Sequence, residues 1–238
     1  MNAKNQALEL LWNGDRRPAR GPQRGLTMER IVAAAIEVAE QEGLAALSMR
    51  RVATRLGVGT ASLYTYLPGR TELEALMLDA IGAEDPLPHE WPGGWREKVQ
   101  AWARSDWTAF RRHPWVLQLM ATSPVPGPNT LRWLDSALLV LADTALTEAE
   151  KVAVVESVDA YVRGVARLQV DTDANAGDPA EADRVNEALG RLVDFTRYPA
   201  LERALRAGVA PWSGDQFEFG LQRLLDGVES LIAARAAG

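Results

Sequence analysis

The fold is decided by residues 48–67, which read SMRRVATRLGVGTASLYTYL. The apolar residues at 49, 52, 53 and 56 follow the i, i+3, i+4, i+7 spacing of one helix face, and Ser48 is placed to cap the first turn of that helix. Gly57 stands where a helix ends in the left-handed conformation. A second, short helix is expected from about Gly59 to Tyr66. The stretch therefore predicts a helix, a tight turn and a second helix.

The second of these helices has an unusual surface. On a helical wheel Leu63 and Leu67 fall together and form the packing side, flanked by Thr60 and Tyr64. The opposite side holds small or hydroxyl-bearing residues and no carboxylate: Ala61, Ser62, Thr65 and Tyr66. Small side chains let a helix approach base edges, and hydroxyls can donate to phosphates. The pattern favours a helix that enters the major groove of DNA, and the alternative is a helical hairpin that binds no DNA.

The distribution of charge agrees with a nucleic-acid contact at one end of the chain. The whole chain of 238 residues has a formal net charge of −6. Residues 1–70 hold 10 Lys and Arg against 6 Asp and Glu, whereas residues 71–238 hold 16 against 26. A basic N-terminal part on an acidic body is expected when only one end meets phosphate, although chance and a basic tail would give the same numbers.

The chain divides into three parts by composition. Residues 1–25 are rich in Gly, Pro and Arg, and most of them are predicted to form a flexible basic arm that either reaches DNA or has no role. A short helical turn is an option before the arm, at Leu8, Leu10, Leu11 and Trp12. Residues 26–84 contain the helix-turn-helix, and residues 85–238 form a larger second domain. An all-α fold is expected, because helical periodicity recurs throughout and no strand pattern stands out.

Helix ends are also visible in the sequence. Thr27 is expected to cap the first helix of the N-terminal domain, and capping boxes are expected at Thr71 with Glu74 and at Thr147 with Glu150. Residues 171–178 are expected to form an acidic loop. After the helix-turn-helix, helices are expected at about 71–84, 93–112, 114–122, 129–145, 148–170, 179–197, 199–207 and 215–235.

Several classes of protein are disfavoured by what the sequence lacks. It has no cysteine, which excludes disulfides, thiol catalysis and Cys-ligated zinc, and only two histidines, so we expect no metal site. It contains no nucleophile, phosphate-loop or catalytic-triad motif, so an enzyme is not expected, and no cofactor is predicted. No apolar run is long enough to span a membrane and no signal segment is evident, which makes a cytoplasmic location the default.

Tryptophan is concentrated in one stretch of the second domain. Residues 91–133 hold six of the eight tryptophans. An aromatic cavity with a few polar groups is typical of a site for small apolar ligands, but tryptophan also simply fills large cores. Polar anchors for a ligand would come from this set: His113, Gln118, Asn129, Asp159 and Gln169. His113 precedes a proline at a helix boundary, so its ring has the alternative role of bonding backbone groups there.

Two helices are apolar on more than one face. Residues 148–170 carry a series of valines with Ala160 and Gly164, and residues 215–235 carry Phe and Leu with Gly220 and Gly227. Such helices are buried on more than one side, and small residues allow close helix approach. Two of them from each subunit would make a four-helix dimer interface, and burial within one chain is the alternative.

Residues 27–79 resemble the DNA-binding domain of the TetR family of bacterial transcriptional regulators. The resemblance rests on an Ala-rich helix at 31–39, on LSMRRVATRLGV at 47–58 and on LYTYLPGR at 63–70. Tyr66 stands where the family usually has His, and Arg70 where it usually has Lys. The resemblance assigns DNA contacts to Thr27, Arg50, Thr60, Ala61, Ser62, Tyr64, Thr65, Tyr66 and Arg70.

The second domain resembles the branch of that family that contains the tetracycline repressors, through RHPW at 112–115 and FEFGLQRLLDG at 217–227. The family implies a homodimer, here through residues 148–170 and 215–235, and a small-molecule effector. It favours a pocket contacted by Trp102, Trp107, Phe110, His113, Trp115, Gln118, Met120, Trp133 and Leu134. The set of histidines that would hold a tetracycline–magnesium complex is missing.

The function expected from these observations is that of a ligand-responsive transcriptional repressor. It would bind a palindromic operator in double-stranded DNA as a homodimer and leave it when a small apolar or aromatic effector binds. Two alternatives stay open at this point: an activator of the same family, and a DNA-binding architectural factor with no small-molecule ligand.

Overall fold

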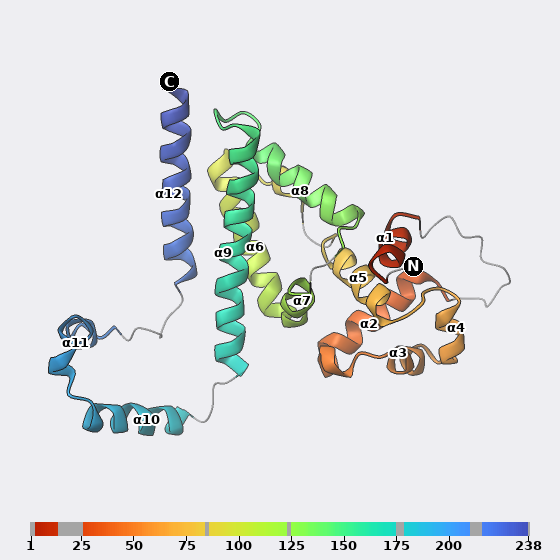
Figure 1. Cartoon of the computed structure of the whole chain (residues 1–238), viewed down its shortest axis with the longest axis horizontal. Helices are drawn as coiled ribbons and strands as arrows, with labels where there is room; N and C mark the ends of the chain where they lie inside the picture. The colour runs from red at the N-terminus through yellow and green to blue at the C-terminus, as the bar shows by residue number, and fades with distance from the viewer. Residues whose placement is uncertain are drawn as a thin grey trace.

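The structure, a computed structural model, describes residues 3–13, 26–83, 86–122, 125–174, 179–209 and 216–237. Every regular element within these ranges is helical, which confirms the all-α expectation (Figure 1). The helices are α1 (Ala3–Asn13), α2 (Met28–Glu42), α3 (Met49–Leu56), α4 (Thr60–Tyr64), α5 (Arg70–Ile81), α6 (Trp95–Arg112), α7 (Pro114–Met120), α8 (Pro128–Val140), α9 (Glu148–Ala174), α10 (Pro179–Leu192), α11 (Pro199–Arg206) and α12 (Phe217–Ala236). The described residues also form short 3₁₀ turns, η2 (Leu44–Ala46), η3 (Pro88–Glu90) and η4 (Phe195–Arg197).

Local sequence sets most of the helix ends. The Thr27 and Ser48 hydroxyls accept from the third backbone N–H of α2 and α3, and Gly57 ends α3 with φ of +69°. The capping box of Thr147 and Glu150 at the start of α9 forms as predicted.

The capping box predicted at Thr71 with Glu74 does not form. Helix α5 begins at Arg70, directly after Gly69, so Thr71 lies inside the first turn instead of preceding it. The Glu74 carboxylate accepts a hydrogen bond from Arg70 Nε at 2.6 Å instead. The residue before α5 therefore has no side chain with which to cap it.

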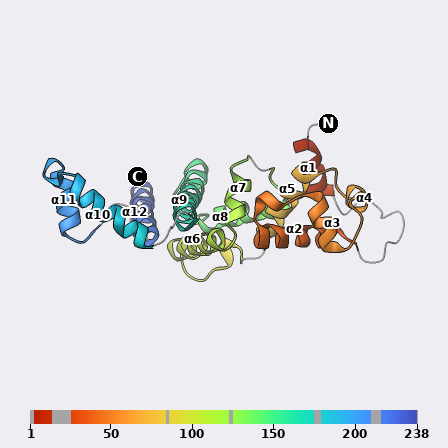
Figure 2. The ribbon, with the colours of Figure 1, turned by 90° about the horizontal axis from the view of Figure 1, so that it is seen from below.

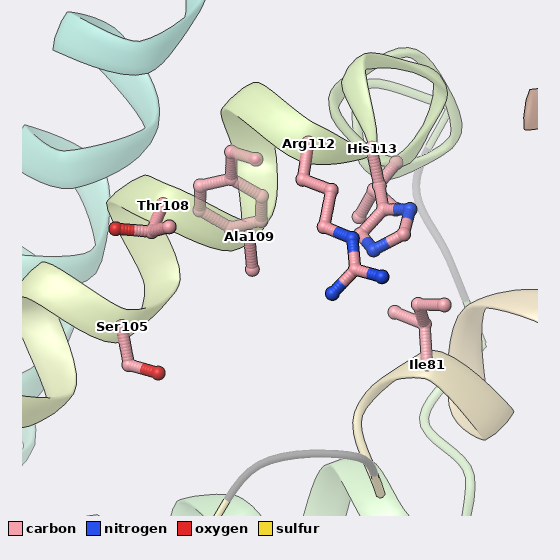
Figure 3. A pocket seen from close by; sticks show the side chains of 8 residues that line it. Ile81, Ser105, Thr108, Ala109, Arg112 and His113 are labelled. Atoms are coloured by element: carbon pink, nitrogen blue, oxygen red, sulfur yellow. The ribbon is translucent and has the colours of Figure 1, made fainter.

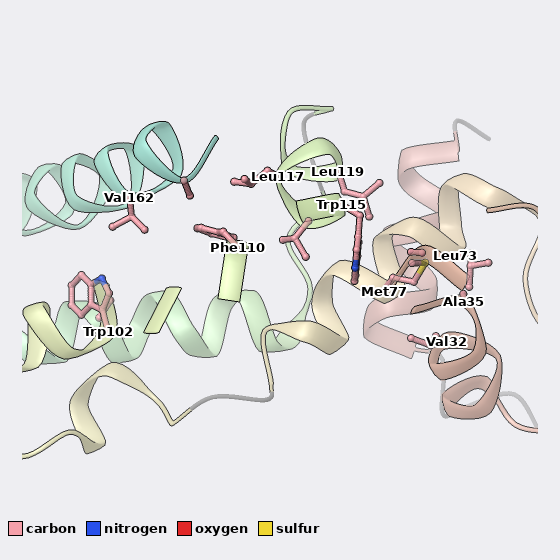
Figure 4. Packing of buried hydrophobic residues seen from close by; sticks show 14 of the residues in the cluster. Val32, Ala35, Leu73, Met77, Trp102, Phe110, Trp115, Leu117, Leu119 and Val162 are labelled. Carbon is pink, nitrogen blue, oxygen red and sulfur yellow. The ribbon is translucent and has the colours of Figure 1, made fainter. Parts of the chain in front are cut away.

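Helices α2, α3, α4 and α5 enclose the core of the N-terminal domain. Ile31, Val38, Val52 and Leu63 are fully buried, and Leu73 of α5 packs beside Val32 and Ala35 of α2 (Figure 4). Burial of each Leu, Ile or Val side chain contributes about 1.5–3 kcal/mol. This core fixes α4 against α3 and leaves the far side of α4 exposed.

The first helix is longer than the short helical turn that the sequence offered before the basic arm. Residues 3–13 form α1, which packs on α5 through the buried Ala7 and Leu10. The indole Nε1 of Trp12 donates to the carbonyl oxygen of Pro126 at 3.2 Å. Apolar residues at 7, 10 and 11 follow the i, i+3, i+4 spacing of a helix face, which explains the difference. Residues 14–25, the rest of the predicted arm, lie outside the described residues.

The second domain is built on α6, α8, α9 and α12. Helix α9 packs on α6 and runs antiparallel to α12 (Figure 1). Arg96 and Arg104 of α6 pair with Asp226 and Glu218 of α12. Helix α9 continues to Ala174, so residues 171–174 of the expected acidic loop are helical, and residues 175–178 lie outside the described part of the chain. The predicted domain boundary, residues 84 and 85, lies outside it as well.

Helices α10 and α11 project from the rest of the molecule at the end opposite α4 (Figure 2). They leave several large apolar side chains exposed, among them Val185, Leu189, Leu192, Tyr198 and Leu205. An isolated helix of this length is only marginally stable in water. Among the described helices none is long and apolar enough to cross a membrane.

Candidate DNA-contacting helix and interdomain cavity

Helix α4 presents most of its predicted outer face to solvent. Leu63 and Leu67 are buried, as the wheel predicts. Ala61 and Thr65 are exposed and Ser62 is half-buried. Tyr64, expected at the edge of the packing side, is 54 % exposed. The outer surface of α4 therefore consists of small side chains, hydroxyls and one tyrosine ring.

The helical wheel predicts Tyr66 on this outer surface, but the structure places it elsewhere. Its ring is half-buried and its hydroxyl donates to the carbonyl oxygen of Leu26 at 2.8 Å. The reason is that α4 ends at Tyr64, so a wheel continued to residue 66 assigns the wrong direction. Thr65, in the same turn, donates its hydroxyl to the carbonyl of Ser62 at 2.7 Å. Tyr66 thus ties the start of the N-terminal domain to the end of α4.

The basic residues around α4 differ in how free they are. Arg70 donates from Nη1 to Leu47 O at 2.9 Å and from Nη2 to Leu44 O at 3.2 Å, besides its pair with Glu74. The side chain of Arg50, in contrast, is exposed and has no partner within the described ranges. Arg50 is therefore the predicted cationic contact that the fold leaves available to a phosphate.

A cavity of about 140 Å³ lies where the two domains meet (Figure 3). It is lined by Ile81 from the end of α5, by Ser105, Thr108, Ala109, Phe110 and Arg112 from α6, and by His113 and Val116 at the start of α7. Phe110 and His113 belong to the predicted effector set. The other lining residues were not in that set, which stays a prediction: Ile81, Ser105, Thr108, Ala109, Arg112 and Val116. Arg112 was part of the RHPW motif, so the motif itself was the available signal.

The other predicted effector residues are placed elsewhere. Trp102 packs edge-to-face on Trp133, with ring centroids 5.7 Å apart. Trp107 stacks on Phe217 at 4.7 Å. Trp115 is buried and points toward Met77 of α5 (Figure 4). Met120 is half-buried, whereas Gln118 and Leu134 are exposed. Trp102 and Trp115 thus belong to the core and Trp107 and Trp133 pack against it, while their role toward an effector stays a prediction.

Three of the predicted polar anchors bond within the chain. Asn129 Nδ2 donates to Asp79, and Gln169 donates to Asp173 at 2.8 Å. Asp159 pairs with Arg163 one turn along α9. Burial raises the pKa of Asp159, and the charge of Arg163 opposes that rise. Within the described residues no cluster of His, Asp or Glu is arranged to hold a metal ion.

Asp79 joins α5 to the second domain and was not foreseen. Its buried carboxylate accepts from the backbone N–H groups of Asn129 (3.4 Å) and Thr130 (3.0 Å), in the first turn of α8. It also accepts from the Thr130 hydroxyl at 3.1 Å. An acidic side chain at a helix N-terminus is stabilising there. Helix α5 thus has one end in the helix-turn-helix and the other on α8.

Much of the apolar surface of α9 and α12 is used inside the chain. Val155, Val158 and Val162 of α9 and Leu221 and Leu225 of α12 are buried. The exposed large apolar side chains of the two helices in the described residues are Val152, Leu168 and Phe219. Gly220 packs against the Tyr161 hydroxyl within the chain, whereas Gly164 and Gly227 face open space.

Comparison with known proteins follows this division of the chain. Residues 31–75 match the family "Bacterial regulatory proteins, tetR family", and residues 87–232 match "Tetracyclin repressor-like, C-terminal domain". The chain is 41% identical, over 97% of its length and 87% of the relative's, to the HTH-type transcriptional repressor DrrR1 of Streptomyces coeruleorubidus.

Solved structures give the same picture. Apo ActR from Streptomyces coelicolor is 30% identical with a TM-score of 0.74, and the match covers 91% of this chain and 99% of ActR. ActR in complex with actinorhodin is 28% identical with a TM-score of 0.75, covering 87% of this chain and 97% of that one.

Proposed function

The chain belongs to the tetR family of bacterial regulatory proteins, and from this premise we propose that it is a repressor controlled by a small molecule. It would bind a palindromic operator as a homodimer, in the cytoplasm, and leave the operator when an apolar or aromatic effector binds. The family is one of transcriptional regulators, not of enzymes. The observation that carries the ligand response is the cavity lined by both Ile81 of α5 and the α6–α7 corner.

The proposed DNA contacts come from the exposed side of α4 and its basic surroundings. Tyr64, Thr65 and Ala61 are exposed, and Ser62 is half-buried beside them. Thr60 and Arg50 would contact phosphates, while Thr27, Tyr66 and Arg70 would help chiefly by holding the domain in shape. In a dimer the two α4 helices would enter successive major grooves, about 34–36 Å apart.

The proposed dimer uses the open faces of α9 and α12. Leu168 and Phe219 are 69% and 67% exposed, values that favour a partner surface for such large apolar residues. Gly164 and Gly227 would let the partner's helices approach closely. The exposed apolar side chains of α10 and α11 favour the same second copy as their cover.

Ligand control follows from the position of the cavity. Helix α5 is held at one end by Arg70 and at the other by Asp79, and Ile81 reaches into the cavity. A molecule in the cavity would move α5 relative to α6 and change the separation of the two α4 helices. Such coupling is typically about 1–3 kcal/mol and acts equally in both directions.

The test is operator binding measured by fluorescence anisotropy with DNA from around the protein's own gene and a scrambled duplex as control. We expect two copies, or a multiple, per palindrome. Ser62→Ala and Tyr64→Ala should each weaken binding by about tenfold, equivalent to about 1.4 kcal/mol. Asp135→Ala, an exposed change on α8, should not. Equal affinity for the scrambled duplex, or unchanged affinity in both α4 variants, contradicts the proposal.

A further inference from the structure

The cavity between the domains is lined by apolar, hydroxyl-bearing and cationic side chains. Ile81, Phe110 and Val116 supply the apolar part, and Ser105 and Thr108 add hydroxyls. None of its lining residues carries a carboxylate. The Arg112 side chain extends toward Ile81, with the His113 ring beside it (Figure 3). The charged groups available to a ligand here are therefore donors of hydrogen bonds, not acceptors.

Arg112 is unlike the other arginines of its helix. Arg96 and Arg104 each pair with carboxylates of α12, at 2.6 Å from Asp226 and 2.6 Å from Glu218. Arg111 lies over the ring of Trp107, 4.7 Å from its centroid. Arg112 makes none of the hydrogen bonds or ion pairs found among the described residues, and it lines the cavity. An arginine fork left open beside a cavity suits a carboxylate, which it can bind through two parallel hydrogen bonds.

His113 supplies a second, independent observation. The residue is 7 % exposed, and its Nδ1 is buried without a hydrogen-bond partner among the described residues. The nearest acid is Glu40 of α2, whose Oε1 lies 2.9 Å from Nδ1 but outside hydrogen-bond geometry. A buried polar atom without a proper partner is rare in folded proteins. The His113 ring therefore lies between the cavity and the carboxylate of Glu40, and its Nδ1 makes no hydrogen bond to that carboxylate.

We propose that the effector carries an acidic group, which Arg112 and His113 bind, and that this group competes with Glu40 for His113. The inference rests on the proposed function and deepens it by naming the chemical class of the ligand. The apolar body of the ligand lies against Ile81, Phe110 and Val116. The acidic group of the ligand binds the His113 ring, so the attraction between Glu40 and His113 is lost when the ligand binds. Binding at the cavity is thereby linked to the position of α2.

The size of the cavity selects the probes. A cavity of about 150 Å³ holds one benzene ring, so aromatic acids of one and two rings are suitable. The probes are benzoate, phenylacetate and 1-naphthylacetate, each paired with its uncharged amide. Binding to the full-length protein is measured by calorimetry, and operator release by anisotropy. The variants are Arg112→Gln and Glu40→Gln, with Arg132→Gln, an exposed arginine of α8, as the charge-matched control.

We expect at least one acid to bind more tightly than its amide and to release the operator. Arg112→Gln should weaken the binding of that acid by about tenfold, while Arg132→Gln should leave its affinity unchanged. Glu40→Gln should increase the affinity for the acid, because the competing carboxylate is gone. The proposal is overturned if no acid binds better than its amide, or if Arg112→Gln and Arg132→Gln behave alike. If Glu40→Gln does not increase the affinity for the acid, Glu40 does not compete with the ligand for His113.

The proposed function fails in a different way. If the amides release the operator as well as the acids do, the proposal of an acidic ligand fails, but the proposal of a ligand-controlled repressor stands. Absence of specific operator binding would remove the repressor, although the calorimetric difference between acid and amide could still be measured. The two failures are therefore distinguishable.

Discussion

The carboxylate of Asp79, near the end of α5, caps the first turn of α8 by accepting a hydrogen bond from the Thr130 backbone N–H at 3.0 Å. Asp79 belongs to the N-terminal domain and Thr130 to the second domain. Asn129 adds a bond to the backbone carbonyl of Asp79 at 3.2 Å. This pair of residues is thus a polar joint between the domains, and it lies two residues from Ile81, which lines the cavity.

Replacing Asp79 with alanine should destabilise the protein. The change removes a helix cap and leaves the N–H groups of the first turn of α8 without an acceptor, at a cost of about 1–2 kcal/mol. Urea denaturation followed by circular dichroism at one protein concentration measures the effect. Asp135→Ala, at an exposed position on α8, should change stability by less than about 0.5 kcal/mol. Equal stability of the two variants would contradict a joint at Asp79.

Replacing Arg70 with lysine separates a structural role from a DNA contact. Lysine keeps the positive charge that a phosphate would attract, but it cannot donate to Leu44 O and Leu47 O with the fixed fork of a guanidinium. We expect a loss of about 1 kcal/mol in stability, with operator affinity at low temperature nearly unchanged. A Lys variant of full thermal stability but weak operator binding would instead assign Arg70 to a contact that needs the guanidinium.

Two glycines of α12 should respond to alanine in opposite ways. At Gly220 a Cβ would collide with the Tyr161 hydroxyl, which donates to Phe217 O at 2.9 Å, so Gly220→Ala should lower the melting temperature. At Gly227 a Cβ meets nothing within 4 Å, and the helix itself should gain up to about 1 kcal/mol.

The same Gly227→Ala variant tests the proposed dimer. If a helix of the second copy crosses α12 at Gly227, the added methyl group will separate the helices and weaken dimerisation. Sedimentation equilibrium of this variant beside the unchanged protein measures the dissociation constant. A dimer as tight as that of the unchanged protein would mean that no partner helix approaches there.

Glu150 should make stability depend on pH in acid. Hydrogen bonds from Arg235 and from Thr147 lower the pKa of its carboxyl from 4.5 to about 2. Because the folded state holds this pKa below that of the unfolded chain, the contribution is complete above about pH 4.5 and is lost as the pH falls toward 2. Glu150→Gln should therefore melt at a lower temperature than the unchanged protein at pH 7, and the difference should shrink below pH 4.5.

The pKa values of Glu218 and Asp226 are also lowered, by hydrogen bonds from Arg104 and Arg223 respectively. Both carboxyl groups are present in the unchanged protein and in the Glu150→Gln variant, so their titration cancels when the two melting temperatures are compared. A difference in melting temperature that stays constant from pH 7 to pH 2 would argue against the ion pair of Glu150 with Arg235.

The sequence predicted what local chemistry determines. Ser48 and Gly57 mark the ends of α3, because Ser48 supplies a hydroxyl that caps the first turn and Gly57, without a Cβ, adopts the left-handed conformation. Thr71 and Glu74 have the right spacing for a cap but not the right position, since Arg70 starts the helix. The end of α4 could not be predicted from the sequence, because Thr65 and Tyr66 continue the helical pattern of polar and apolar residues although the chain turns there.

The cavity was harder to foresee than the fold. Its residues come from three helices whose relative placement depends on tertiary packing, and no periodicity links Ile81 to Ser105. Tryptophan content pointed to Trp102 and Trp107, yet large rings pack as readily on one another as on a ligand. Asn129 was chosen for its polarity, but its partner Asp79 is 50 residues away and could not be identified without the structure.

The hydrogen bond from Trp12 to Pro126 also sets an order of events during synthesis. Helix α1 leaves the ribosome before the surface of α5 that covers Ala7 and Leu10, which is made some 60 residues later, and the acceptor of Trp12 lies 114 residues along the chain. At typical bacterial rates of about 5–20 residues per second, the first helix waits several seconds for its last partner. Helix α1 thus reaches its last contact only after residue 126 has been translated.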